Sequence, residues 1–160
     1  MPKLNAPFLF FSMQLDETPL LNRGRVFLCD QEKGMIGRWQ ATSGLGAYQD
    51  IGDWSKQGGG VIPAPYNLAN PIPFYWVQVE PVNLSHVLGI QGNGYPIAPF
   101  SVKTKEGVER SDLLIHSDEN APGTLGCVGI WRSDWADFEK SFNNNCNGID
   151  RVRLFVGYTY

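Results

Sequence analysis

One histidine and one cysteine lie eleven positions apart in the stretch HSDENAPGTLGCVGI, residues 116–130. A cysteine becomes a useful nucleophile only as its thiolate, and a neighbouring imidazole is the usual base. His116 follows the apolar run LLI, and Cys127 begins the run CVGIW. The residues between them contain proline and glycine, which favour a turn over a helix. Two adjacent strands joined by this turn would bring the imidazole and the sulfur within reach of each other.

The backbone beside this cysteine also suits acyl chemistry. Gly126 leaves the main chain near the sulfur unobstructed, so the amides of residues 125–127 can face an oxyanion as it develops. The alternative is a thiol that simply packs in the core near a histidine, because cysteine is among the most buried residue types. The spacing alone leaves both interpretations open.

Six residues of this stretch resemble the active-site signature of the L,D-transpeptidase (YkuD-like) family: His116, Ser117, Thr124, Gly126, Cys127 and Val128. The family's pattern is a strand that ends in His-Gly or His-Ser, a loop, and then Ser/Thr-His-Gly-Cys with a small aliphatic residue. The upstream stretches ATSG (41–44) and GGGVIPAPYNL (58–68) are also similar to family segments. The resemblance spans roughly residues 24–132. It implies a mainly β fold, an L,D-transpeptidase-like sandwich or barrel of short mixed strands.

The resemblance also implies a mechanism. His116 takes the proton from Cys127, and the main-chain carbonyl or the hydroxyl of Ser117 orients the imidazole as the third member of a triad. The thiolate attacks the carbonyl after the third residue of a peptidoglycan stem peptide, and D-alanine leaves. An amine resolves the acyl-enzyme in transpeptidation, and water resolves it in carboxypeptidase cleavage. No cofactor and no metal are expected in this chemistry.

The chain resembles a divergent member of the family, because the loop between His116 and Cys127 is shorter than in typical members and two positions differ. Leu125 stands where the family has histidine, so only His116 remains as a base, and we expect it to lower the pKa of Cys127 well below that of a free thiol. Gly129 stands where the family has arginine or asparagine. We expect Arg132 to take over that role in substrate binding. Thr124 and Gly126, which match the signature, are the other expected substrate-binding residues.

The pattern of apolar residues predicts many short strands and one helix. Gly and Pro together number 29, and such frequent breakers favour strands. The helix is expected over 132–144, with Ser133 as its N-cap and an aromatic core face at Trp135, Phe138 and Phe142. Residues 43–60 form a glycine-rich loop of the kind that lines clefts. Strands are expected at 7–13, 25–30, 36–42, 74–80, 86–92, 112–116, 127–131 and 151–158.

Composition excludes several classes of function. The 160 residues suit one domain, 1–160, with one helix in its C-terminal half. The net charge of −3 gives no basic excess for binding nucleic acid. The three cysteines follow no zinc-binding spacing, and a pair between Cys29 and Cys146 stays open. No apolar run approaches the length of a membrane span.

The N-terminus carries a short apolar patch behind Lys3 without a cleavage site, so we expect a first strand there and not a signal peptide. We therefore expect a protein that acts in the periplasm or cell wall as a phage virion or lysis protein or as an injected effector. Its partner would be a peptidoglycan stem peptide, and the sequence does not give its oligomeric state.

Two alternatives to an L,D-transpeptidase remain. The enzyme can be a cysteine hydrolase that cuts a cross-link. The chain can instead be an inactive structural module that binds cell wall, such as a phage tail or baseplate component. We expect His86 to have a structural role. Tyr66, Trp76 and Tyr95 can line a cleft, but packing in the β core explains these aromatic residues equally well.

Overall fold

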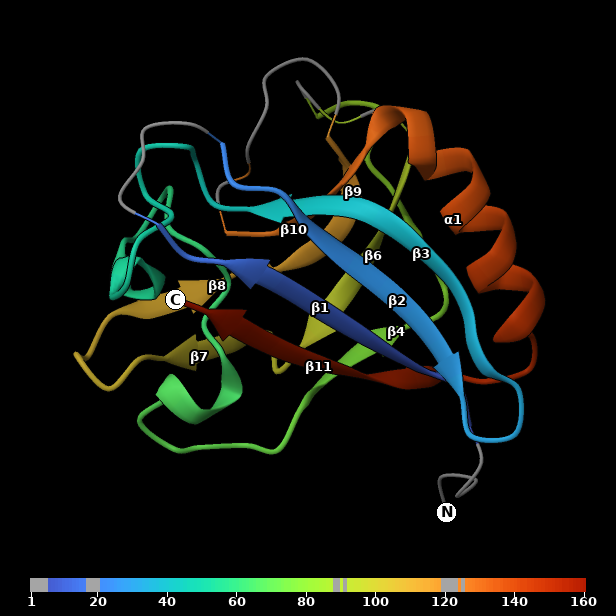
Figure 1. Ribbon diagram of the computed structural model, residues 1–160, viewed down its shortest axis with the longest axis horizontal. Helices are drawn as coiled ribbons and strands as arrows, with labels where there is room; N and C mark the ends of the chain where they lie inside the picture. Colours follow the sequence, from blue (N-terminus) through green and yellow to red (C-terminus); the bar gives the residue numbers. More distant parts are fainter. Residues whose placement is uncertain (1–5, 17–20, 88–89, 91, 119–123, 125) are drawn as a thin grey trace.

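A computed structural model of the chain describes residues 6–16, 21–87, 90, 92–118, 124 and 126–160. It is mainly β, with one nine-stranded sheet and one α-helix in the C-terminal half, as the sequence predicts. Figure 1 shows the strands curving around a common interior, with the helix along one side. No helix in the described ranges is long and apolar enough to cross a membrane.

The sheet closes on itself. Its order is β4-β11-β1-β2-β3-β10-β9-β6-β5, and β4 also pairs with β6. β5 is attached outside this ring, so eight of the nine strands form a closed barrel. Closure removes the unpaired strand edges that an open sheet would leave. The strands of the barrel and its appended strand are β1 (Phe8–Gln14), β2 (Gly24–Asp30), β3 (Gly34–Ser43), β4 (Tyr75–Gln78), β5 (Val82–Asn83), β6 (Asn93–Ala98), β9 (Leu114–Asp118), β10 (Val128–Trp131) and β11 (Arg151–Thr159).

Two strand pairs of the barrel are parallel, β1 with β11 and β9 with β10. The alternation of buried and exposed residues along β11 and β1 is that of strands with one face in a core. Outside the barrel, β7 (Ser101–Lys103) and β8 (Glu109–Ser111) form a short hairpin. Two 3-10 turns, η1 (Asp53–Ser55) and η2 (Pro65–Asn67), interrupt the long connection between β3 and β4.

The helix α1 (Arg132–Asn145) covers the barrel interior with the three aromatic side chains predicted from sequence, Trp135, Phe138 and Phe142, all of which are buried. The ring of Phe138 lies edge-on to Trp39 of β3 at 5.1 Å between centroids, and Phe142 lies 4.8 Å from Tyr95 of β6. The indole Nε1 of Trp39 also donates to Asp137 at 2.7 Å. These contacts fix the helix to β3 and β6.

Two local predictions are wrong. The residue that precedes α1 is Trp131, no side chain caps the helix, and Ser133 is therefore not its N-cap. The strand expected at 86–92 does not form in its described part, because His86 lies in a turn closed by the Val87 N–H and the Leu84 carbonyl. The strand begins instead at Asn93, with β6. Seven of the eight expected strands have a counterpart in the barrel.

Candidate active site

The parallel pair β9–β10 carries both candidate catalytic side chains. In this register His116 lies opposite Gly129, and Ile115 lies opposite Val128. Cys127 immediately precedes β10, so by alternation it shares the face of Gly129 and therefore of His116. The two residues are therefore diagonal neighbours on one face of the parallel pair. The sequence prediction that the two strands are adjacent is thus met by the fold.

Glycine flanks the imidazole on both neighbouring strands. His116 pairs with Gly94 of β6 on one side and with Gly129 on the other. A Cβ at Gly94 would lie 2.4 Å from Leu84 Cδ1, and one at Gly129 would lie 2.6 Å from Thr124 Cγ2. These two side chains therefore occupy the space that side chains at Gly94 and Gly129 would fill, and His116 is only 5 % exposed.

The main-chain carbonyl of Ser117 holds the imidazole. His116 Nδ1 lies 2.7 Å from that oxygen, so Nδ1 carries the proton and donates it. Nε2 is then the unprotonated nitrogen that can accept a proton. Of the two contacts that the family resemblance implied for Ser117, the geometry provides the one through the carbonyl. Burial lowers the pKa of His116 below 6.5, and the Ser117 carbonyl opposes this in part.

The thiol of Cys127 faces a main-chain carbonyl and is not hydrogen-bonded to the imidazole. Its Sγ lies 3.6 Å from the carbonyl oxygen of Asp112, and no hydrogen bond to His116 is present among the described residues. Burial raises the pKa of Cys127 to about 11, although the Leu114 backbone and the charge of Arg110 both lower it. The expectation of a lowered pKa is therefore wrong for this conformation, because burial outweighs both favourable contacts.

Asp112 carries backbone strain beside this thiol. Its φ is 57°, and no other described residue except glycine has a positive φ. Aspartate tolerates this left-handed region better than most residues, but the conformation still costs free energy. The turn between β8 and β9 thereby directs the Asp112 carbonyl toward the sulfur.

Arg110 of β8 packs next to the turn that precedes Cys127. The sequence pattern did not predict a role for it. Its side chain is 3 % exposed. Nη1 donates to the carbonyls of Trp54 and Val61, the latter at 2.9 Å, and Nη2 donates to Gly60 at 3.0 Å. A Cβ on Gly126 would lie 2.1 Å from Nη2, so the guanidinium packs directly against the residue before Cys127.

Two tyrosines continue this arrangement. The hydroxyl of Tyr158 donates to the carbonyl of Ile62, and that of Tyr75 donates to Pro63 at 2.7 Å. Together with Arg110, they bind the four consecutive carbonyls of residues 60–63. A segment without regular secondary structure is thus fixed by buried side chains, as buried polar backbone groups require. It forms one wall of the site.

Thr124 fixes the chain on the other side of the cysteine. Its Oγ1 donates to the Cys127 carbonyl at 2.6 Å and accepts from the Gly44 N–H at 3.2 Å. The Thr124 N–H donates in turn to the Gly44 carbonyl at 3.1 Å. Because Thr124 is 4 % exposed, its position is that of a support for the Cys127 backbone and not that of an open substrate contact.

The other two predicted substrate-binding residues, Gly126 and Arg132, do not lie together. Gly126 lies between Arg110 and Cys127 with a φ of 106°, a conformation that glycine alone adopts readily. Arg132 is an exposed residue at the start of α1, at the opposite end of β10 from Cys127. A strand rises about 3.3 Å per residue, so these two residues lie roughly 15 Å apart along the chain. Arg110 and not Arg132 is therefore the cation beside the sulfur.

The remaining candidates lie elsewhere. His86 is exposed in its turn, and Tyr95 is buried against α1. Trp76 lies under the guanidinium of Arg151 at 4.2 Å, and Tyr66 is 49 % exposed. Leu125 lies outside the described residues, and all three cysteines are free thiols. The described ranges hold no group of three or more side chains suited to a metal ion.

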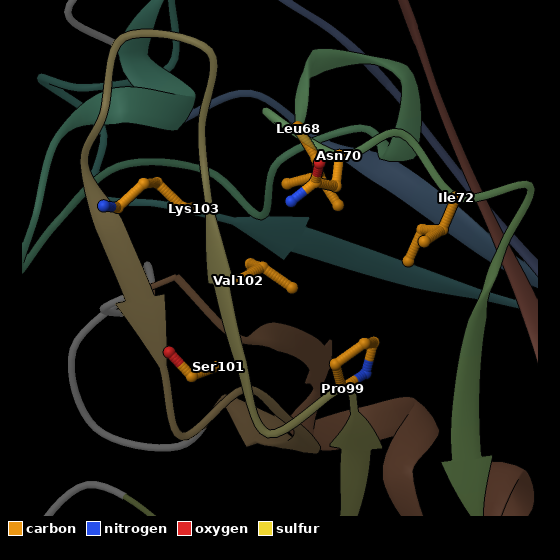
Figure 2. A pocket seen from close by; sticks show the side chains of 7 residues that line it. All are labelled: Leu68, Asn70, Ile72, Pro99, Ser101, Val102 and Lys103. Atoms are coloured by element: carbon orange, nitrogen blue, oxygen red, sulfur yellow. The ribbon is translucent and has the colours of Figure 1, made fainter.

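A hollow of about 210 Å³ lies along β7, and Figure 2 shows its lining side chains. They come from residues 68–72 and from the chain between β6 and the end of β7, and neither Cys127 nor His116 is among them. Val102 in this lining is the register partner of Arg110 on β8. The hairpin β7–β8 therefore borders the hollow with one strand and supplies Arg110 with the other.

Comparisons of the chain with models of protein families, with curated proteins and with solved structures found no match. The resemblance to L,D-transpeptidases therefore rests on the motif around His116 and Cys127 and on no assigned family.

Proposed function

We propose that this protein is a cysteine acyltransferase or peptidase of the L,D-transpeptidase type that acts on peptidoglycan stem peptides. The observation that carries the proposal is the placement of His116. Its imidazole is oriented by the Ser117 carbonyl and shares one sheet face with Cys127, which lies two residues before Gly129, the register partner of His116. A nucleophile, a base and a group that orients the base are the parts such a reaction needs.

The reaction would begin from a neutral pair. Burial raises the pKa of Cys127 and lowers that of His116, so neither side chain is charged at pH 7. The thiol would rotate about χ1 from the Asp112 carbonyl toward Nε2 of His116. As the sulfur forms a bond to the substrate carbonyl carbon, its proton passes to Nε2, and the carbonyl oxygen becomes an oxyanion.

The second half of the reaction returns the proton. When the tetrahedral intermediate collapses, the C–N bond breaks, and the imidazolium of His116 gives its proton to the leaving D-alanine amine. An incoming amine or water then attacks the thioester, transfers a proton to His116 and releases Cys127. The substrate would be met in the periplasm or cell wall, by a phage virion or lysis protein or by an injected effector.

A second candidate is an inactive module that binds cell wall. The observation in its favour is the position of the sulfur, which lies against the Asp112 carbonyl and has a pKa raised to about 11. In such a module the thiol would be a packed side chain with no chemistry.

Defined muropeptides distinguish these candidates. Purified protein is incubated with a disaccharide-tetrapeptide, with and without an added D-amino acid, and the masses of the products are read. Loss of D-alanine indicates a carboxypeptidase, exchange of the terminal residue or a dimer indicates a transpeptidase, and Cys127→Ala should abolish each product. Cys29→Ala is the matched control, because that thiol lies on β2 away from the site. Unchanged substrate together with retention of the protein on sacculi would support the binding module.

A further inference from the structure

Arg110 is a buried cation without a carboxylate partner in the part of the chain that is described. Its hydrogen bonds go to three main-chain carbonyls. The side chains that interact with its charge are Tyr75, Tyr158 and Cys127. An isolated charge is costly to bury, so proteins normally pair it. Of these three side chains the Cys127 thiol is the most acidic in its ordinary state, and it is therefore the anion that this cation is best placed to meet.

The main-chain carbonyls use three of the five N–H donors of the guanidinium, and one of the other two is on Nη2. Both Nη1 hydrogens are used by Trp54 and Val61, and one Nη2 hydrogen is used by Gly60. The second Nη2 hydrogen has no acceptor among the described residues. It belongs to the nitrogen that packs against Gly126, one residue from the nucleophile. A fixed cationic donor at this place needs no reorganisation when negative charge develops beside it.

We propose that Arg110 is a positioning residue for Cys127. Its guanidinium holds the 60–61 backbone and the Gly126 turn in place, and it supplies the positive charge against which the thiolate forms. The same charge stabilises the oxyanion of the acyl-transfer step, and this last part rests on the proposed function.

The other charged groups around the thiol do not replace Arg110. The carboxylate of Asp112 on the β8–β9 turn raises the pKa of Cys127. His116 on β9 is uncharged at neutral pH because burial lowers its pKa. The Asp118 side chain, also on β9, lies over Gly129, with its Cβ 3.1 Å from where a Cβ of that glycine would be. Arg110 is thus the cation among these groups.

The test is the pH dependence of Cys127 alkylation by iodoacetamide, read for each cysteine peptide by mass spectrometry, and it needs no substrate. Arg110→Met keeps the length of the side chain and removes its charge. We expect the midpoint of Cys127 to rise, so that its alkylation at a fixed pH between 7 and 9, where the protein stays folded, slows about tenfold or more. Arg110→Lys should restore most of the shift. Arg151→Met, which removes an exposed arginine stacked on Trp76, should leave the midpoint unchanged.

An unchanged Cys127 midpoint in folded Arg110→Met would overturn this inference, and Arg110 would then be a structural residue only. If Arg110→Met does not fold, the unsubstituted protein provides the answer by NMR. The guanidinium signals of Arg110 should move with pH at the midpoint of Cys127, and they should not move in Cys127→Ser. Signals that stay constant in the unsubstituted protein would overturn the inference. A shifted midpoint without any muropeptide turnover would contradict the proposed function and leave the role of Arg110 in place.

Discussion

His116 and Cys127 are both kept uncharged by burial at neutral pH, and their neutrality determines how a reaction between them begins. A preformed thiolate–imidazolium pair would need the two side chains in contact, whereas Sγ lies against the Asp112 carbonyl. The imidazole is already oriented through Nδ1, so its free nitrogen can act as a general base. In the proposed reaction the proton would therefore move during attack and not before it.

Replacement of His116 tests directly whether its imidazole is the general base. His116→Ala should reduce turnover by about 10²- to 10⁴-fold, the usual contribution of a general base. His86→Ala is the control, because His86 is exposed in a turn. Steady-state rates on a defined muropeptide give the comparison. A larger loss in folded His86→Ala than in His116→Ala would mean that the base is assigned to the wrong residue.

The pH profile follows from the direction of the His116 pKa. The base must be neutral, and burial lowers its pKa below 6.5, so activity should persist to pH values below 6.5 before it declines. The pH at which kcat/KM falls to half on the acidic side of its profile measures the pKa of His116 in the free enzyme. A midpoint above 6.5 would mean that the imidazole is stabilised in its charged form, as in an ion pair with the thiolate.

At the scale of elements, the sequence predicts the strands that present the site better than it predicts the residues around it. The apolar runs that end at His116 and begin at Cys127 are β9 and β10, and α1 has the aromatic face expected for it. β6 was missed because Gly94 and Pro96 break its apolar pattern. That glycine is needed where Leu84 packs, which only the tertiary structure shows.

Arg110 was missed for a related reason. It lies in KTKEGVERSD, residues 103–112, whose composition is that of an exposed hairpin. The β7–β8 hairpin does form there, and its two strands have one buried face. The carbonyls that bind the guanidinium come from residues 54–61, about fifty positions away in the chain. No local pattern encodes such a contact.

The turn before Cys127 leaves no room for a side chain at Gly126. Gly126→Ala would place a Cβ 2.1 Å from Arg110 Nη2 at a φ of 106°. Gly107→Ala is the matched control, because Gly107 has a φ of 85° with nothing within 4 Å. Both variants share the conformational cost, and overpacking adds about 1–3 kcal/mol at Gly126 alone. Urea unfolding measures the difference, and equal losses of stability in the two variants would mean that the guanidinium does not fill this space.

At the scale of the whole molecule, the closed barrel buries groups that ionise at alkaline pH. Burial raises the pKa of Cys127 to about 11, and it raises those of Cys146 and Tyr95 to about 12. In the unfolded chain these groups ionise near 9 for cysteine and 10 for tyrosine. The stability that they contribute is therefore complete below pH 9 and is lost as the pH rises toward 12.

The temperature of half-unfolding should consequently decrease when the pH is raised from 8 to 10.5. Tyr95→Phe removes one of the ionising groups, so its midpoint should fall less over the same interval, whatever its value at pH 8. Circular dichroism at the two pH values measures both proteins. A midpoint that is constant up to pH 10.5 would show that these groups are not buried in the folded state.

Covalent capture of the substrate tests the central claim most directly. The protein is mixed with a disaccharide-tetrapeptide without an acceptor amine, the reaction is quenched in acid, and the intact mass and the cysteine peptides are measured. The account predicts an adduct on Cys127 with the mass of the donor minus D-alanine, absent in Cys127→Ala and weaker in His116→Ala. Products that form in Cys127→Ala, or an adduct on any residue other than Cys127, would contradict it.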